Sequence, residues 1–444
     1  MEEHTSRVIF GISAAWIATL IFVVVYGLVI SEKINRAILA LLGAGLLILT
    51  GVLTQEAALR GVDFNTIGLL LGMMVIVNIT GRSGVFQYVA IWSAKKVDAR
   101  PAGVLIMLSA VTAVFSAMLD NVTTVLLVVP VTILITEELK VNSFPFLVSE
   151  ILSSNIGGTA TLIGDPPNIM IGSAVGLTFN QFVANLAPVI VVIEVVTLAI
   201  FMFLWRNSLI ATREAMLQVM QFKEIEALKD TRLLKQSLFV ITLVIIGFMT
   251  AHSLHLEPAT IAIFGAALLL LMDNLRHSPE HQSEKVHQAF ASAEWVTLLF
   301  FVGLFILVHG LESAGVIRWM AQLLLDATGG NFNTTAVAVL WASAILSAFI
   351  DNIPFVATMI PMIKSMAPVF GGEQALVPLW WALSLGACLG GNGTLIGASA
   401  NLVVAGLSER AGHPIRFIPY MKASFLLMLM SIAFSNIYLY YRYL

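Results

Sequence analysis

Long apolar runs constrain this sequence more than any other feature. Two of them, residues 8–30 and 37–54, stand near the start, and similar runs recur along the 444 residues. A run of about 20 apolar residues crosses a bilayer as a helix, because lipid offers no partner for backbone polar groups. Barrel strands would alternate apolar and polar residues, and these runs do not. We therefore predict an all-α polytopic membrane protein.

Charge and cysteine content narrow the class further. Only 11% of the residues are charged, whereas a soluble protein carries about 25%. The net charge is −3 with no basic patch, so we expect no nucleic-acid partner. The single cysteine, Cys388, excludes an intrachain disulfide. The acidic start, Glu2 and Glu3, is unlike a cleaved signal peptide, and the first run is expected to be a permanent span.

We predict about ten complete spans plus two hairpins. The hairpins cover residues 103–139 and 335–366, and a polar linker covers residues 206–236. The linker separates two membrane repeats, residues 1–205 and 237–444. The predicted spans are residues 8–30, 37–54, 65–81, 146–176, 184–205, 237–254, 258–274, 293–310, 377–406 and 418–440.

The basic residues set the expected orientation. With this order of spans, most of the 23 Lys and Arg residues fall on the side of the linker. Basic residues accumulate on the cytoplasmic side of membrane proteins. We therefore predict a multi-pass protein of the cell inner membrane, in contact with lipid, with a cytoplasmic linker and both termini outside.

The two halves repeat each other. Asp63-x-x-Thr66 matches Glu294-x-x-Thr297, and Asp120-Asn121 matches Asp351-Asn352, both at a shift of 231 positions. The run GGTATLIG at 157–164 matches GGNGTLIG at 390–397. In the predicted topology the repeats begin on opposite sides of the membrane. Inverted repeats of this kind are typical of secondary transporters, whose substrate binds where the repeats meet.

Aspartates at the hairpin tips are the first candidate site residues. Asp120, Asn121 and Thr123 lie at one tip, and Asp351 and Asn352 lie at the other. An aspartate in the middle of a membrane segment costs about 3 kcal/mol. Helix ends at a tip would offer free amides and carbonyls to an ion. The alternative is that each aspartate only caps the second arm of its hairpin, and one side chain can do both.

Paired glycines within apolar runs mark a second group of candidates. Glycine weakens a helix and permits unwinding, which would free carbonyls beside Asn and Thr side chains. Pro166 and Pro167 remove backbone donors as well. Tight helix packing through small residues is the alternative. The candidates in this group are Asn155, Gly157, Gly158, Thr159, Thr161, Asn168, Gly390, Gly391, Asn392, Thr394 and Asn401.

Several ionisable residues have no acidic counterpart in the other repeat. Asp165 matches Ala398, so we regard Asp165 either as a coupling carboxylate or as a helix-end group bonded to Asn168. The remaining membrane-embedded ionisable residues are interpreted as structural pairs, and they are Glu150, Glu194, His309 and Glu312.

Other function classes are less consistent with the sequence. The chain lacks a Gly-x-x-x-x-Gly-Lys-Ser/Thr loop, so it should not hydrolyse ATP itself; a separate ATPase subunit stays open. Gly81-Arg82-Ser83-Gly84 with His309 would suggest an intramembrane protease, but the counterpart of Ser83 is Ala314. An ion channel fits the inverted repeat less well than a transporter does. We expect neither an enzyme nor a cofactor, and no metal site is assigned.

The motif NIGGTATLIGDPPN at 155–168 resembles the signature of the ion transporter superfamily. CLGGNGTLIGASAN at 388–401 and DNIPFVATMIP at 351–361 are similar to the melanosomal P-protein side of that superfamily, whose relatives include the arsenite/antimonite pump and NhaD-type sodium–proton antiporters. The resemblance covers nearly the whole chain. It implies two inverted repeats, each with a re-entrant hairpin and a broken helix. It also implies a site between the hairpin tips and the helix breaks, and homodimers occur in the superfamily.

These observations together predict a proton-coupled exporter of a small inorganic solute. Arsenite or antimonite is the first substrate expected, and sodium in a sodium–proton antiporter is the alternative. Asp120, Asp165 and Asp351 are the expected proton carriers. Because Cys388 is the only thiol, an arsenite site would have to rely on oxygen and amide groups. The Asp-Asn pairs replace the Ser-Asn-Thr motif of dicarboxylate relatives, which disfavours anionic carboxylates.

Overall fold

The computed structural model describes every residue except 1–7, 10, 32 and 276, and the described part is almost entirely helical. Its only strands are β1 (Val8–Ile9) and β2 (Ile12–Ser13), which pair as a small antiparallel hairpin. The expected all-α class is confirmed. The first predicted span is wrong at its start, because the helix begins at Ala14 after the Ser13 cap rather than at residue 8.

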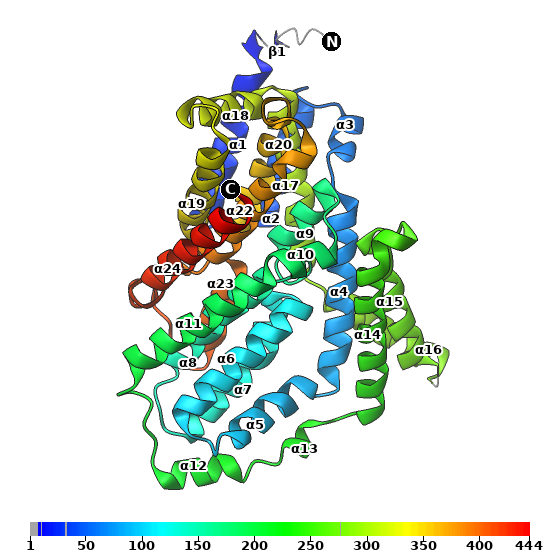
Figure 1. Ribbon diagram of the computed structural model, residues 1–444. Coiled ribbons are helices and arrows are strands. Elements are labelled where there is room, and N and C mark those ends of the chain that lie inside the picture. Colours follow the sequence, from blue (N-terminus) through cyan, green and yellow to red (C-terminus); the bar gives the residue numbers. More distant parts are fainter. Residues whose placement is uncertain (1–7, 10, 32, 276) are drawn as a thin grey trace.

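The first repeat contains eleven helices (Figure 1). They are α1 (Ala14–Ile30), α2 (Arg36–Leu49), α3 (Gln55–Arg60), α4 (Phe64–Arg82), α5 (Val85–Lys96), α6 (Pro101–Met118), α7 (Asn121–Glu138), α8 (Phe144–Thr159), α9 (Pro166–Val175), α10 (Phe179–Asn185) and α11 (Ala187–Trp205). The linker forms α12 (Arg213–Met220) and α13 (Glu224–Ala227).

The second repeat follows the same order. It comprises α14 (Thr231–Leu254), α15 (Pro258–Asn274), α16 (Pro279–Ala291), α17 (Trp295–Ser313), α18 (Val316–Ala327), α19 (Phe332–Phe349), α20 (Asn352–Lys364), α21 (Ala367–Phe370), the 3-10 helix η1 (Glu373–Leu376), α22 (Val377–Gly390), α23 (Ser399–Arg410) and α24 (Phe417–Tyr443).

Equivalent helices confirm the duplication. The pairs α4 and α17, α5 and α18, and α6 and α19 have equal lengths and begin 231 positions apart. In Figure 1, α5 to α7 lie toward the end of the molecule that carries α12 and α13, whereas α18 to α20 lie toward the opposite end. The two hairpins, α6–α7 and α19–α20, therefore enter from opposite ends, as an inverted repeat requires.

The repeats interlock rather than standing side by side. Helix α4 packs along α15, and its counterpart α17 packs along α2. A Cβ atom on Gly72 would lie 2.6 Å from the carbonyl carbon of Ala262, and one on Gly303 would lie 2.6 Å from that of Ala40. Small residues thus let helices of opposite repeats cross closely.

Several predicted spans are shorter in the structure. Among the described residues, eight helices have the length and composition to cross a membrane, and the hairpin arms α6, α7 and α19 are among them. Helix α2 has only 14 residues, about 21 Å at 1.5 Å per residue, which is less than a bilayer core of about 30 Å. The predicted span 37–54 accordingly ends at Leu49. The described residues between α1 and α2 are exposed, whereas Arg36 at the start of α2 is partly buried.

The linker is attached to the first repeat. Lys95 Nζ on α5 lies 2.5 Å from Glu224 Oε2 on α13, and the Lys229 amide donates to the Ser83 carbonyl at 2.9 Å. Hydrogen bonding from the Lys95 ammonium lowers the pKa of Glu224. The sequence did not predict α5 and its repeat counterpart α18, which are short helices at the hairpin bases.

Candidate functional site

Each hairpin tip ends in an aspartate that caps the following helix. Asp120 Oδ1 accepts from the Thr123 amide at 2.7 Å, and Asp351 Oδ1 accepts from the Ile353 amide at 3.1 Å. The capping interpretation is confirmed for both. Oδ2 of each aspartate takes no part in the cap, so this second oxygen can contact another group.

The hairpin tips are bound to the helix breaks, as the two constellations suggested. The Asn121 amide donates to the Gly164 carbonyl at 3.0 Å, and the Asn352 amide donates to the Gly397 carbonyl at 3.3 Å. The breaks, residues 160–165 and 391–398, separate α8 from α9 and α22 from α23. Broken helices are therefore present in both repeats.

Threonine hydroxyls add hydrogen bonds near the contacts between the hairpins and the helix breaks. Thr161 Oγ1 donates to the Ala117 carbonyl and Thr394 Oγ1 donates to the Ala348 carbonyl, each at 2.5 Å. Thr159 Oγ1 donates to the Asn155 carbonyl at 2.7 Å. The Thr161 and Thr394 hydroxyls tie each break to the first arm of its hairpin, whereas the Thr159 bond lies within α8.

The paired glycines serve close packing as well as helix breaking. A Cβ on Gly157 would lie 2.2 Å from the Ala113 carbonyl oxygen, and one on Gly390 would lie 2.5 Å from that of Ala344. Gly158 and Gly391 face the carbonyls of Gly164 and Gly397 in the same way. Both interpretations drawn from the sequence therefore apply at these positions.

Asparagines join the two helix breaks across the repeat interface. Asn155 Nδ2 donates at 2.9 Å to Oδ1 of both Asn392 and Asn401. Its repeat counterpart Cys388 donates from Sγ to Asn168 Oδ1 at 3.5 Å. The side-chain amides of Asn168 and Asn401 in turn donate to backbone carbonyls of their own breaks. Most polar side-chain atoms of this cluster are hydrogen-bonded within the protein, and these bonds hold one helix break against the other.

A small cavity lies between the two hairpin tips. Its volume is about 20 Å³, enough for roughly one water molecule. Asn352 Nδ2 lies 3.4 Å from Asp165 Oδ1 within it. Asp120 Oδ2 and Asn121 Oδ1 are buried without a hydrogen-bond partner among the described residues. The polar residues of the lining are Arg36, Asp120, Asn121, Asp165, Glu294, Thr297, Asn352 and Ser399.

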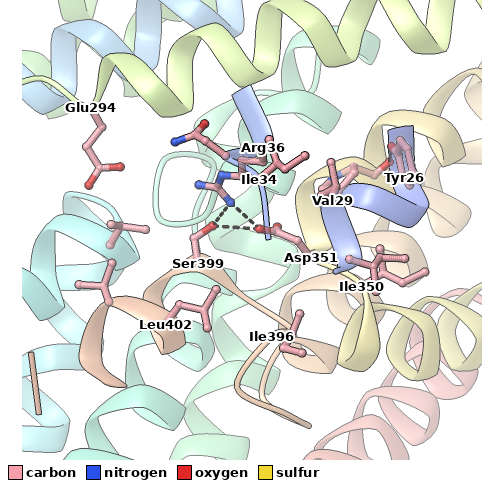
Figure 2. Close-up of a pocket in the computed structure, with 15 residues that line it drawn as sticks. Tyr26, Val29, Ile34, Arg36, Glu294, Ile350, Asp351, Ile396, Ser399 and Leu402 are labelled. Carbon is pink, nitrogen blue, oxygen red and sulfur yellow. Dashed lines mark hydrogen bonds and ion pairs between the residues drawn. The ribbon is translucent and has the colours of Figure 1, made fainter. Parts of the chain in front are cut away.

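A larger hollow, which we call the vestibule, adjoins this cavity. It measures about 310 Å³ and shares Arg36, Val122, Glu294 and Ser399 with the cavity. Figure 2 shows the Arg36 side chain pointing toward Asp351 and Ser399. Arg36 Nη1 lies 2.7 Å from both Asp351 Oδ2 and Ser399 Oγ. The hairpin-tip aspartates therefore differ in charge environment.

A second hollow of about 310 Å³ lies at the other end of α17. Its lining includes Asp63, the counterpart of Glu294, together with Arg60, His309 and Lys364. It shares no lining residue with the central cavity. The central cavity therefore borders the vestibule and has no lining residue in common with the second hollow.

The site contains residues that sequence reasoning missed, chiefly Arg36, Glu294, Thr297 and Ser399. Glu294 stood in the repeat alignment opposite Asp63, and that match could have identified it. No group of three or more His, Cys, Asp and Glu side chains among the described residues is arranged to hold a metal ion.

The protease alternative finds no support in the geometry. Ser83 Oγ donates to the Thr80 carbonyl at 2.6 Å, and its own carbonyl contacts the linker. His309 Nδ1 lies 3.3 Å from Glu312 Oε2 on the lining of the second hollow. Ser83 and His309 therefore bond to different partners and not to each other.

Comparison with known proteins agrees with this architecture. The chain is 42% identical to an uncharacterized transporter of Mycobacterium tuberculosis, covering 96% of this chain and 98% of that one. It is 33% identical to the P protein of Sus scrofa over 95% of this chain, which spans 59% of that protein. The YdaH transporter of Alcanivorax borkumensis shares the fold, with a TM-score of 0.52 at 14% identity over 97% of this chain and 99% of that one.

The match to a family model covers most of the chain. Residues 26–386 match the model described as citrate transporter, and that range contains both hairpins and the first helix break. The relatives are transporters, and the resemblance to the ion transporter superfamily is confirmed. This chain is a multi-pass membrane transporter, not an enzyme, and it belongs to the citrate transporter family.

Proposed function

We propose that this transporter exchanges protons for a small inorganic cation, with sodium as the first candidate. The observation that carries the proposal is the charge around the central cavity. Asp120, Asp165 and Glu294 line it, Asp351 stands beside it, and Arg36 is the one basic residue of the lining. A carboxylate can bind either a proton or a cation. The proton and the cation therefore compete for one binding position, which is the basis of exchange.

Asp120 is the proposed centre of this competition. Its Oδ2 is buried and has no hydrogen-bond partner in the part of the chain that the structure describes. Carboxylate and amide oxygens suit hard cations, and Asn121 Oδ1 offers a second free acceptor in the same cavity. A cation bound there would replace the proton on the carboxyl group.

The family description names citrate, and the cavity gives little support for it. A polyanion would meet the carboxylates of Asp120, Asp165 and Glu294 with Arg36 as the only basic residue of the lining. Like charges at such short range repel strongly where water is scarce. The cavity volume of about 20 Å³ also leaves room for little more than a single water.

Export of arsenite or antimonite is the second candidate. Their neutral trihydroxides avoid charge repulsion and donate hydrogen bonds, which Asp120 Oδ2 and Asn121 Oδ1 can accept. The vestibule of about 310 Å³ has room for them, but Asp120 and Asn121 line only the cavity of about 20 Å³, so a trihydroxide would reach these acceptors only if that cavity widened. Against this candidate, the donors of Asn155, Asn168 and Asn401 are already used within the protein.

The proposed orientation places the vestibule on the cytoplasmic side of the inner membrane. The vestibule is lined by Ile34 and Asn35 from the loop between α1 and α2, and the basic-residue bias assigns that loop and the linker to the cytoplasm. The structure would then represent an inward-facing state of an alternating-access cycle.

Everted membrane vesicles with an imposed proton gradient test the proposal. Sodium, lithium, arsenite, antimonite and citrate are added separately, while internal pH and solute content are followed together. Vesicles from cells without the protein are the control. Sodium-evoked proton efflux supports the cation exchanger. Proton-driven arsenite uptake without a sodium response would replace it with the second candidate, and citrate uptake would overturn both.

A further inference from the structure

A row of buried polar side chains lies inside the first hairpin, between α6, α7 and α8. We call it the hydroxyl seam, and its members are Ser109, Thr132, Thr136, Ser143, Ser149 and Glu150. None of them is more than 1% exposed. Thr136 Oγ1 lies 2.7 Å from Ser143 Oγ, Ser109 Oγ donates to Ser149 Oγ at 3.0 Å, and Thr132 Oγ1 donates to Glu150 Oε1 at 2.5 Å.

The second repeat has no such seam. By the shifts of 231 and 233 positions, the counterparts of Ser109, Thr132, Ser149 and Glu150 are all apolar: Leu340, Ile363, Ala382 and Leu383. Helices α19, α20 and α22 nevertheless pack in the same arrangement as α6, α7 and α8. The fold therefore does not require polar groups at these positions, and their presence in one repeat points to a task other than packing.

Glu150 is the ionisable member of the seam, and half of its carboxyl group is unsatisfied. Its Oε2 is buried without a hydrogen-bond partner. In the described part of the chain, no basic nitrogen lies within 4.0 Å of it. Burying a carboxylate without a cation is costly. A proton on the free oxygen removes that cost, so Glu150 is a place where a proton can reside.

No other ionisable group takes the place of a counter-ion. Helix α6 carries none. The ionisable groups on the other helices packed against α8 form no ion pair or hydrogen bond with Glu150 in the described structure. They are Asp120, Glu137 and Glu138 at the two ends of α7, Glu194 on α11, Cys388 on α22, Glu409 and Arg410 on α23, and Tyr420, Lys422, Tyr438, Tyr440, Tyr441, Arg442 and Tyr443 on α24.

The seam lies between the proposed cytoplasmic side and the hairpin tip as three hydrogen-bonded pairs. Its outer end, Thr136 and Ser143, lies at the loop between α7 and α8. Glu150 is six residues from the start of α8 and five before Asn155, or about 9 Å and 7.5 Å along the axis. Beyond it, Ser154 Oγ donates to the Asn121 carbonyl at 3.0 Å, next to Asp120.

We propose that Glu150 is a proton relay between Asp120 and the cytoplasm, on a route separate from the vestibule that the solute uses. This inference rests on the proposed proton coupling. Asp120 gives up the proton that it took from outside, the proton passes by way of Ser154 to the Glu150 carboxylate, and Glu150 releases it along the seam toward the loop between α7 and α8. The first step moves one proton from the Asp120 carboxyl group to the Glu150 carboxylate, and the second moves it from the Glu150 carboxyl group to water at the loop, so no other reactant is needed.

The test uses purified protein in proteoliposomes and measures two activities. One is solute-evoked proton movement, and the other is solute–solute exchange without a proton gradient. We expect Glu150→Gln to slow proton movement about 100-fold, the scale of a positioned proton-transfer group, and to leave solute exchange close to wild type. Glu150→Asp should restore part of the proton movement and shift its pH profile.

Glu194→Gln is the matched control, because Glu194 is also a membrane-embedded carboxyl bonded to a hydroxyl, that of Ser153, but lies on α11 outside the seam. Both activities of the Glu194→Gln variant should match wild type.

Wild-type proton movement in Glu150→Gln would overturn the relay. If Glu150→Gln loses both activities, Thr132→Val decides, since it removes only the hydroxyl that donates to Glu150. Slowed proton movement with intact exchange in Thr132→Val supports the relay, and unchanged proton movement overturns it. Failure of the wild type to move protons would instead sink the proposed function.

Discussion

The guanidinium of Arg36 lies 2.7 Å from Asp351, whereas the repeat counterpart Asp120 has no cation partner in the described structure. Arg36 also contacts Ser399 and Thr297, and its guanidinium lies 5.1 Å from the centre of the Phe300 ring. The two hairpin tips are therefore alike in sequence and unlike in charge. Asp351 is paired with a cation of the protein, and Asp120 is the aspartate that we propose to bind a proton or a transported ion.

Replacing Arg36 by Gln should destabilise the protein through the charge left on Asp351. The side chains are 25% and 13% exposed, so we expect a loss of about 2 kcal/mol, below that of a fully buried pair. Thermal unfolding in detergent measures it. The double variant Arg36→Gln/Asp351→Asn should regain most of the loss. A double variant no more stable than Arg36→Gln alone would contradict the pairing.

Substituting Gly157 tests the contact between the first helix break and the hairpin. Gly157→Ala places a methyl group 2.2 Å from the Ala113 carbonyl oxygen, and overpacking of this kind costs about 1–3 kcal/mol. The melting temperature should fall. Gly406→Ala on α23 is the control, since nothing lies within 4 Å of its added Cβ, and a helical Gly-to-Ala change is stabilising by about 0.5–1 kcal/mol. Equal melting temperatures for the two variants would argue against the close approach.

Introduced cysteines should report which hollow faces which side. Cys388 is buried, so the native thiol gives a low background. Leu402→Cys lies in the vestibule and Ala174→Cys lies in the second hollow. We expect a membrane-impermeant maleimide to label Leu402→Cys from the cytoplasmic side and Ala174→Cys from outside. The reverse pattern would invert the proposed orientation.

The linker contact should depend on pH. Because Lys95 holds the pKa of Glu224 below its usual value of 4.5, the contact is fully formed above that value and is lost as the pH falls through the lowered pKa. Glu224→Gln mimics protonation at neutral pH, and limited proteolysis should then cut residues 206–230 faster. Glu226→Gln is the control, since Glu226 pairs with Lys223 in the linker itself. Equal cleavage of the two variants would show that the Lys95 contact does not hold the linker.

Features encoded locally could be predicted from the sequence. The duplication, both hairpins and both helix breaks follow from glycine, proline and aspartate at matching positions such as Gly157 and Gly390. The crossing of α4 with α15 and of α2 with α17 could not be predicted, because Gly72 and Ala262 are far apart in the chain and neither carries a pairing signal. Short helices such as α5 and α18 were missed although a left-handed glycine, Gly84 or Gly315, precedes each, because 12 residues are too few to predict a span.

The site was predicted in part for the same reason. Asp120, Asn121, Asp165 and Asn352 do line one cavity, as their twinned motifs suggested. Arg36 was missed because its role depends on the length of α1 and α2, which brings the loop between them against Asp351. A helix shortened by a few residues leaves no clear trace in an apolar run.

Proton movement by Asp120→Asn in proteoliposomes tests the central claim most directly. The variant keeps the size of the side chain and removes its charge, so membrane insertion and the amount of protein in the membrane should match wild type. We predict that solute-evoked proton movement falls to the background of liposomes without protein. Wild-type proton exchange by Asp120→Asn would contradict the assignment of this carboxyl as the place where proton and solute compete.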